Sequence, residues 1–231
     1  MEPGEGQSAR DCWTVAFGNS FSDDDRIIAA GYDNGDVKLF DLRTNTMRYE
    51  TNVANGVTSI EFDRRDIEMN KMAVTTLESK FRVFDMRTQH PTEGFACLAE
   101  KAHKSTGDQA SYCIVLLPPA FHLILNVLMK LLYCIVRCER HLPQNRDLFM
   151  TGGGNGGFNI YKYHYPKSRT TTGKDNVPLG VAGTVELLNS KVISSQPIIS
   201  MDWCHDKEGL CVLSCLDQTI RSYIVTKLNK Y

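Results

Sequence analysis

The chain has 231 residues, of which 42% are apolar and 23% are charged, and its net charge is −1. These values are ordinary for a soluble globular protein, and without a long basic block they give no support to binding of nucleic acid or of an acidic membrane. The opening residues, MEPGEGQSARD, lack the apolar core of a secretory signal peptide.

The cysteines do not indicate a disulfide scaffold. Four of the eight fall inside apolar strand patterns, where a free cysteine behaves as a small hydrophobic residue: Cys12, Cys204, Cys211 and Cys215. A chain of this length can build a core without covalent cross-links. We therefore expect reduced thiols and a cytoplasmic protein.

Short strands with period-two alternation follow one another along the chain. In the first of them, CWTVAF, the apolar residues Trp13, Val15 and Phe17 alternate, and residues 57–62 and 197–203 open later units in the same way. Alternation places such side chains on one face of a half-buried strand. A polar turn and a second strand follow each opening strand, with the sequences RIIAAGY, KMAVTTL and LCVLSCL. This succession predicts an antiparallel meander.

A phrase that repeats with drift indicates the fold. It joins a turn to an alternating strand that carries an aromatic residue, and its copies are Gly31–Arg43, Leu77–Arg87, Gly154–Tyr163 and Leu216–Val225. The aromatic anchors Phe40, Phe84, Tyr161 and Tyr223 are separated by 44, 77 and 62 residues. An interval of 44 is that of a WD-repeat blade, which has about 40–45 residues. We predict an all-β WD-repeat β-propeller with an incomplete set of about four blades.

The turns within the repeated phrase are predicted hairpins. The pairs in equivalent places are Asn34-Gly35, Glu78-Ser79, Asn155-Gly156 and Asp217-Gln218. Asn-Gly is a strong hairpin signal because both residues tolerate positive φ. The glycine-rich run 152–157 resembles a phosphate-binding loop, but it joins two strands and no Lys-Ser/Thr follows it. We interpret it as a hairpin turn and expect no cofactor site.

A weaker pattern predicts a fourth strand in some units. The candidates are MRYETN after the first unit, FACLAEK after the second and TVELLNSKV before the last. Residues 165–180 are polar and turn-rich, and we predict that they form a long surface loop. That loop accounts for most of the excess length in the 62-residue interval.

Residues 107–139 do not fit the repeat. They are dense in Leu, Ile, Val and Cys, they have helical character after two prolines, and their removal restores a 44-residue interval. Three interpretations stay open: a transmembrane helix through 120–136, a helical insertion that packs on the propeller, or an accidental insertion such as translated non-coding sequence. Residues 135–140 contain three charges where the third unit needs an apolar strand. We expect that strand to be missing, distorted or supplied by insertion residues.

The chain therefore divides into four predicted parts. These are a disordered N-terminus at 1–10, propeller blades at 11–106, the atypical apolar insertion at 107–139 and further blades at 140–231. No catalytic constellation stands out, since the six histidines show no paired spacing and no nucleophile pattern accompanies them. Cys211 and Cys215 would lie about 13 Å apart on a strand, too far to share one tetrahedral ion. We expect no enzyme activity, no catalytic residue, no metal and no cofactor.

Several segments resemble the C-terminal part of one known family, the Monad family of WD-repeat dynein axonemal assembly factors. They are DCWTVAFGN, AGYDNGDVKLFDLR, VFDMRTQHPTEGFA, EKAHKST, RHLPQNRDLF and GLCVLSCLDQTIRSYIVTKLNK. The resemblance covers nearly the whole chain except residues 107–139. It is specific because TQHPTEGFA and RHLPQNRDLF are loop segments that generic blade chemistry does not dictate.

The resemblance implies a seven-bladed propeller that acts as a cytoplasmic co-chaperone adaptor. Its implied partners are a prefoldin-like complex containing the pontin and reptin AAA+ ATPases, and dynein subunits. The implied process is pre-assembly of dynein arms for motile cilia, and a role in apoptosis has also been attached to the family. His103 and Asp217 stand at the positions of the histidine and aspartate that brace WD-type blades, so their implied role is structural.

This sequence departs from the family pattern by its insertion and by the implied absence of about three blades. An arc of four blades would leave sheet edges exposed. A second interpretation is a generic WD-repeat receptor for proteins, for example a ubiquitin-ligase substrate adaptor. An enzyme and a membrane-anchored protein are the alternatives from other classes.

Overall fold

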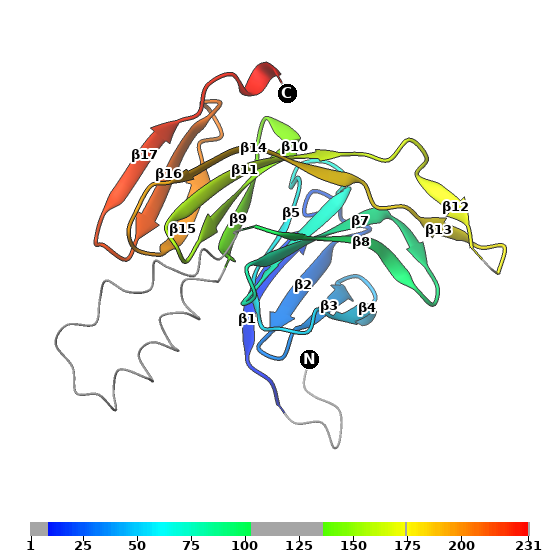
Figure 1. The fold of residues 1–231 in the computed structure, drawn as a ribbon. Coiled ribbons are helices and arrows are strands. Elements are labelled where there is room, and N and C mark those ends of the chain that lie inside the picture. The colour runs from blue at the N-terminus through cyan, green and yellow to red at the C-terminus, as the bar shows by residue number, and fades with distance from the viewer. Residues whose placement is uncertain (1–8, 103–135, 174, 231) are drawn as a thin grey trace.

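A computed structural model describes residues 9–102, 136–173 and 175–230 (Figure 1). The first two blades are antiparallel four-stranded sheets in chain order. Blade 1 contains β1 (Cys12–Gly18), β2 (Ile27–Tyr32), β3 (Asp36–Asp41) and β4 (Thr46–Asn52). Blade 2 contains β5 (Val57–Phe62), β6 (Lys71–Thr76), β7 (Lys80–His90) and β8 (Gly94–Lys101).

The second half of the chain forms two more blades. Blade 3 contains β9 (Val136–Leu142), β10 (Asn145–Gly153), β11 (Gly157–His164) and β14 (Thr184–Val192), and blade 4 contains β15 (Ile198–Trp203), β16 (Leu210–Cys215) and β17 (Ile220–Ile224). The opening strands of successive blades contact one another, β1 with β5, β5 with β9 and β9 with β15. The prediction of an all-β propeller of about four blades is confirmed, and the three predicted fourth strands correspond to β4, β8 and β14.

The described residues contain no α-helix; a single 3₁₀ turn, η2 (Leu228–Lys230), follows blade 4. Across these residues no helix has the length and apolar character needed to cross a bilayer. Residues 103–135, which hold most of the predicted insertion and nearly all of the candidate membrane span, lie outside the described part of the chain.

The core consists of apolar layers between adjacent blades. The layer between blades 1 and 2 contains Ile27, Leu39, Val57, Phe62 and Met72. The layer between blades 2 and 3 contains Phe81, Val136, Phe149 and Tyr161. The layer between blades 3 and 4 contains Met150, Ile198, Trp203 and Leu213. Each of these side chains is at most 5% exposed. Full burial of such a side chain contributes roughly 1.5–3 kcal/mol, so each blade depends on its neighbours for stability.

The predicted hairpin turns are confirmed in all four blades. The second residue of each pair has positive φ: Gly35 (+89°), Ser79 (+57°), Gly156 (+71°) and Gln218 (+65°). In three of the turns the preceding Asn or Asp accepts a hydrogen bond from the backbone N–H two residues later. This local bond stabilises the turn independently of the strands.

The opening strand of blade 3 is formed partly by residues grouped with the insertion in sequence. Val136–Glu139 make up the first half of β9, which pairs with β10. The structure therefore matches one of the three outcomes expected for this strand, the one in which insertion residues supply it. As a result, β9 buries an ionisable side chain, because Glu139 is only 1% exposed.

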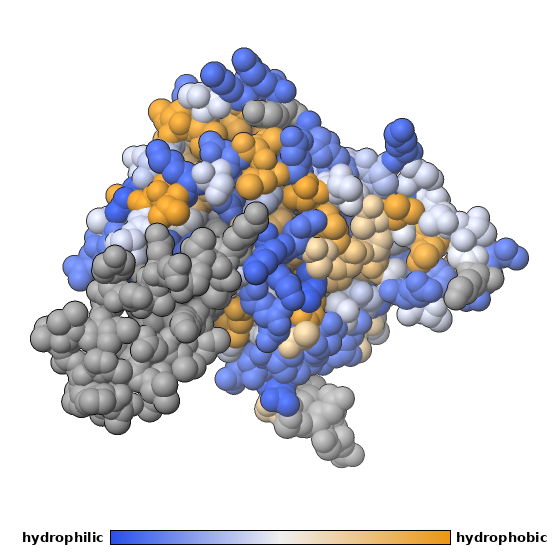
Figure 2. Space-filling view, viewed as in Figure 1, coloured by the Kyte–Doolittle hydropathy of each residue, from blue (hydrophilic) through white to orange (hydrophobic). Residues whose placement is uncertain are grey.

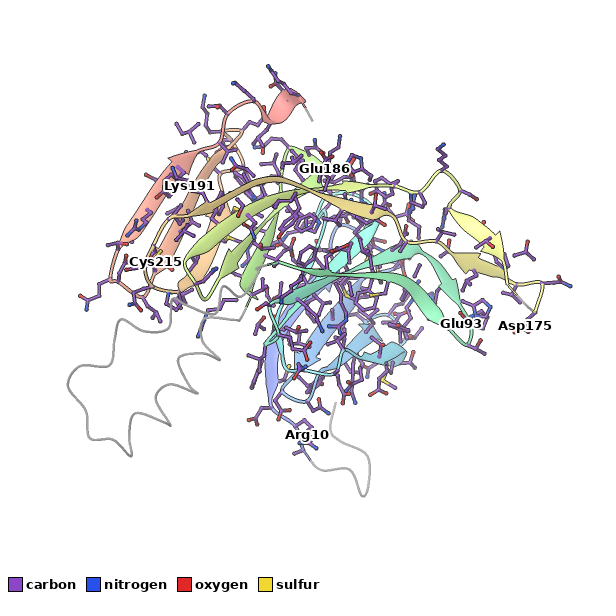
Figure 3. The ribbon with its side chains drawn as sticks, in the orientation of Figure 1. Arg10, Glu93, Asp175, Glu186, Lys191 and Cys215 are labelled. Carbon is purple, nitrogen blue, oxygen red and sulfur yellow. The ribbon has the colours of Figure 1, made fainter. Side chains whose placement is uncertain are left out.

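Residues 165–180 are more ordered than the predicted surface loop. They contain the short strands β12 (Thr170–Thr172) and β13 (Pro178–Gly180), which pair as a hairpin, and β13 contacts β7 and β8 of blade 2. Nε of Arg169 donates to Oγ1 of Thr88 at 3.0 Å. Figure 3 labels Asp175 near the tip of this hairpin and Glu93 at the β7–β8 turn. The loop prediction is therefore wrong for this hairpin, which ties blade 3 to blade 2.

Candidate functional site

The two residues predicted to brace the blades differ in what the structure describes. His103 lies outside the described residues. Asp217 begins the hairpin of blade 4 and accepts hydrogen bonds from Ser194 Oγ at 3.0 Å and from the Arg221 guanidinium at 2.6 Å. Because Ser194 lies between β14 and β15, Asp217 connects the last hairpin to the junction of blades 3 and 4.

Hydrogen bonds also set the ionisation of Asp217. The Thr219 hydroxyl contributes most, with Arg221 and Ser194, and together they lower the pKa of Asp217 to about 2. Charge-assisted hydrogen bonds to a carboxylate favour its ionised form. Asp217 is therefore a fixed anion in the folded state, and its role as a bracing residue stays a prediction.

A buried charge network joins blades 2 and 3. The side chains of Lys71 and Asp63 are both 0% exposed, and their Nζ and Oδ2 atoms are 3.5 Å apart. Lys71 Nζ also lies 3.1 Å from Oδ1 of Asp147 and donates to the Tyr165 hydroxyl at 2.7 Å. Arg146 pairs with Asp63 at 2.8 Å. Burial alone would raise the pKa of Asp63, but Lys71 and Arg146 outweigh it and hold that pKa below its usual range.

A second buried group lies next to this network and consists of two glutamates and a histidine. Glu61 of β5 and Glu139 and His141 of β9 each place a ligand-type atom within 4.8 Å of the others. Burial raises the pKa of Glu61 to about 7, although Arg140 opposes the shift, and burial also raises the pKa of Glu139 well above its usual value. Burial lowers the pKa of His141 to about 3. At neutral pH the imidazole is therefore uncharged and offers a lone pair.

The solvent-facing side of this group is a cleft of about 370 Å³. Its lining includes Glu61, Arg140 and His141 from blades 2 and 3 and Asp202 and His205 from blade 4. The cleft therefore reaches Glu61 and His141 of this group from solvent, where the opening strands of three blades meet.

The two ends of the arc present apolar faces. On β1, Trp13, Val15 and Phe17 share one side, as their alternation predicts, but they are 48%, 66% and 56% exposed. On β17, Ile220 and Ile224 are 81% and 62% exposed. Figure 2 shows apolar side chains gathered over the side of the molecule formed by the last blade. We call these two surfaces the β1 face and the β17 face.

The β17 face also carries a free sheet edge within the described chain. Blade 4 has three strands, in the order β15-β16-β17, whereas the other three blades each have four. Exposed apolar patches and unpaired edges mark places where proteins associate. The end faces are thus candidate contact surfaces for another protein segment.

Sequence reasoning missed both buried groups. Lys71 and Glu61 look like ordinary polar positions of alternating strands, and blade 3 supplies Tyr165 beside Lys71 and both Glu139 and His141 beside Glu61. The available signal was the run of charges at 137–140, which predicted a strained strand but did not locate its neighbours.

Relatives of this chain carry one name. The chain is 54% identical over 229 residues to dynein axonemal assembly factor 10 of Danio rerio, 53% identical over 230 residues to that of Homo sapiens and 49% identical over 230 residues to that of Chlamydomonas reinhardtii. These matches cover 99–100% of the chain but 56% of each relative. The chain thus spans a little over half the length of these relatives. No protein-family model matches it.

Solved structures with little sequence similarity share the fold. The β-propeller domain of Cps50 (Swd1) from Myceliophteria thermophila superposes with a TM-score of 0.59 at 12% identity, covering 96% of this chain and 55% of that one. The computationally designed Ika8 protein gives 0.53 at 12% identity, with 95% and 46% coverage. The match to the Cps50 (Swd1) domain supports the propeller fold alone, and each match uses about half of the compared chain.

Proposed function

We propose that this chain is a non-catalytic propeller scaffold that works in the cytoplasmic pre-assembly of axonemal dynein arms. It would act as an adaptor between dynein subunits and a prefoldin-like co-chaperone complex with its pontin and reptin ATPases. The observation that carries the proposal is the 53–54% identity, along essentially the whole chain, to proteins named dynein axonemal assembly factor 10.

Two sheet faces of the described chain are apolar and can pack against another protein segment. The β1 face and the β17 face expose five large apolar side chains, Trp13, Val15, Phe17, Ile220 and Ile224. Exposed apolar patches of this kind are typical of interaction sites. A scaffold that binds through such surfaces has its function spread over many residues, so no short catalytic list is expected.

The blade-bracing role of His103 and Asp217 is part of the same proposal. The contacts of Asp217 with Ser194 and Arg221 support it, because they connect a hairpin to a blade junction. A rigid arrangement of blades would keep the contact surfaces in register for a large partner.

A pull-down with purified components tests the adaptor role. The tagged chain would be incubated with the pontin–reptin and prefoldin-like assemblies and with dynein subunits, using the human relative as a positive control. We expect the chain to retain both classes of partner. Capture by the human relative but not by this chain would contradict the proposal for this chain.

Paired variants locate the contact. Val15→Glu places a charge on the β1 face, and Val192→Glu is the matched control because Val192 is similarly exposed, at 62%, but lies on β14. We expect the first to reduce retention and the second to leave it unchanged. Retention of ubiquitin-ligase components in place of the named partners would favour the receptor alternative.

A further inference from the structure

We propose that Glu61, Glu139 and His141 bind one divalent transition-metal ion, with Zn²⁺ as the reference ion, at the junction of blades 2 and 3. The three residues meet because β5 and β9 are the adjacent opening strands of their blades. One ligand atom from each lies within 4.8 Å of the others. This site is independent of the proposed adaptor function.

The geometry needs little adjustment to hold an ion. Nδ1 of His141 lies 3.1 Å from Oε1 of Glu139. In a tetrahedral site with metal–ligand distances of about 2.0–2.2 Å, neighbouring ligand atoms are roughly 3.3 Å apart. The Glu139–His141 pair already has that spacing, and a side-chain rotation of Glu61 would bring in the third ligand. Three protein ligands would leave a fourth position for water.

The candidate ligand atoms make no hydrogen bond, although Nη1 of Arg140 lies 3.5 Å from Oε2 of Glu61. Both carboxylate oxygens of Glu139 and both ring nitrogens of His141 are buried and make no hydrogen bond in the structure, and the same holds for Oε2 of Glu61. Glu139 is 1% exposed and His141 is 6% exposed. Buried polar groups in native proteins nearly always have a partner. A metal ion at the centre would satisfy all three side chains at once.

The charge balance also favours a cation. Arg140 lies 3.5 Å from Glu61 and offsets its charge in part. Lys71 and Arg146 oppose a cation here, but both pair with Asp63. In the described part of the chain, the side-chain contact of Glu139 within ion-pair distance is with His141. A divalent cation would let the Glu139 carboxylate ionise without leaving an uncompensated buried charge, which is otherwise costly.

The donor atoms narrow the class of ion. Two carboxylates and one imidazole suit Zn²⁺ and related first-row divalent ions. Ca²⁺ needs six to eight oxygen ligands, more than this group supplies. The cleft that reaches Glu61 and His141 gives an entry path from solvent.

Metal content of the purified 231-residue chain tests the proposal. Accessible thiols would first be alkylated, because exposed Cys12 and Cys97 could bind Zn²⁺. After treatment with EDTA, the chain would be dialysed against Zn²⁺ and its metal measured by elemental analysis. We expect about one tightly held ion per chain, and an affinity at least about tenfold lower in His141→Gln.

A surface pair provides the matched control. His164 Nε2 lies 2.8 Å from Glu186 Oε2, and both side chains are exposed. His164→Gln therefore removes an imidazole next to a carboxylate without touching the buried group. Unchanged Zn²⁺ binding in this variant is expected, whereas an equal loss in both histidine variants would overturn the proposal.

Glu139→Val separates metal binding from folding. This variant removes the buried carboxylate and restores an apolar strand position, so it should fold at least as well as the parent in EDTA. Zn²⁺ should raise the melting temperature of the parent chain but not that of the variant. If Zn²⁺ leaves the melting temperature and metal content of the folded parent unchanged, Glu139 is a buried carboxylate without a partner and the proposal is wrong.

Discussion

Replacing Lys71 with methionine should destabilise the junction of blades 2 and 3. Methionine matches the length of the side chain but removes its charge. The variant loses ion pairs with Asp63 at 3.5 Å and Asp147 at 3.1 Å, and the hydrogen bond to Tyr165. It also loses the ammonium position 4.6 Å from the centre of the Tyr165 ring.

The expected cost follows from burial. Breaking a fully buried ion pair by removing one partner costs about 3–5 kcal/mol, because the other charge stays buried. Arg146 still pairs with Asp63 at 2.8 Å, so we expect a value near the low end, about 3 kcal/mol. A domain of ordinary stability, about 5–15 kcal/mol, would lose a large part of its free energy of unfolding.

Lys38→Met is the matched control. Lys38 also pairs with a carboxylate, Glu50, at 2.9 Å, and its ammonium lies 5.6 Å from the centre of the Tyr32 ring. Its side chain is 22% exposed and that of Glu50 is 41% exposed. Solvent screening makes such pairs worth about 0–1 kcal/mol.

Urea unfolding followed by circular dichroism would compare the two variants with the parent. We also expect the Asp63→Asn/Lys71→Met double variant to lose less than the sum of the two single losses, with a coupling energy of about 0.5–3 kcal/mol. Equal small losses for Lys71→Met and Lys38→Met would refute the argument that burial makes the Lys71 network stabilising.

Three further predictions concern single positions. Gly156→Ala should lower the free energy of unfolding, measured with urea, by at least about 2 kcal/mol, because φ is +71° and an added Cβ would lie 1.9 Å from the Ser194 carbonyl oxygen. Gly180→Ala should lower it clearly less, because an added Cβ there would lie 3.2 Å from its nearest neighbour, the Thr88 carbonyl oxygen. The pKa of Asp217 is lowered to about 2, so the ionised carboxylate stabilises the fold above pH about 3.8 and loses this effect as the pH falls towards 2; the difference in urea midpoint between the parent and Asp217→Asn should shrink over that range. Burial raises the thiol pKa of Cys138 to about 12 and of Cys211 to about 11. Peptide mapping should therefore find both thiols alkylated only after unfolding, whereas the exposed Cys12 should react at once. Rapid labelling of Cys138 in the native protein would contradict the buried position of β9.

The blades could be predicted because their signals are local. Asn155-Gly156 and its equivalents set each hairpin through backbone conformation, and the period-two pattern sets the strands on either side. The hairpin β12–β13 could not be predicted in the same way. Its strands have three residues each and show no alternation, and it is held by contacts with blade 2 that lie far away in the sequence.

Local sequence patterns also could not predict which charged side chains are buried. Lys71 follows an asparagine at the start of a strand, a position that alone suggests solvent exposure, and its partner Tyr165 is 94 residues away. Likewise, alternation in β1 correctly groups Val15 with Phe17 but does not reveal whether a neighbouring blade covers them. Periodicity identifies a face, and only the packing of the whole chain determines its environment.

The contacts between blades 2 and 3 have a consequence for the integrity of the chain. The β12–β13 hairpin, the Lys71 network and the bond from Thr58 Oγ1 to the Val136 carbonyl at 2.6 Å all cross this junction without passing through residues 103–135. A backbone cut between the two halves would therefore leave these noncovalent contacts in place. Residues 1–102 and 136–231, produced separately, should behave as complementing fragments, whose recombination depends on concentration and on Lys71.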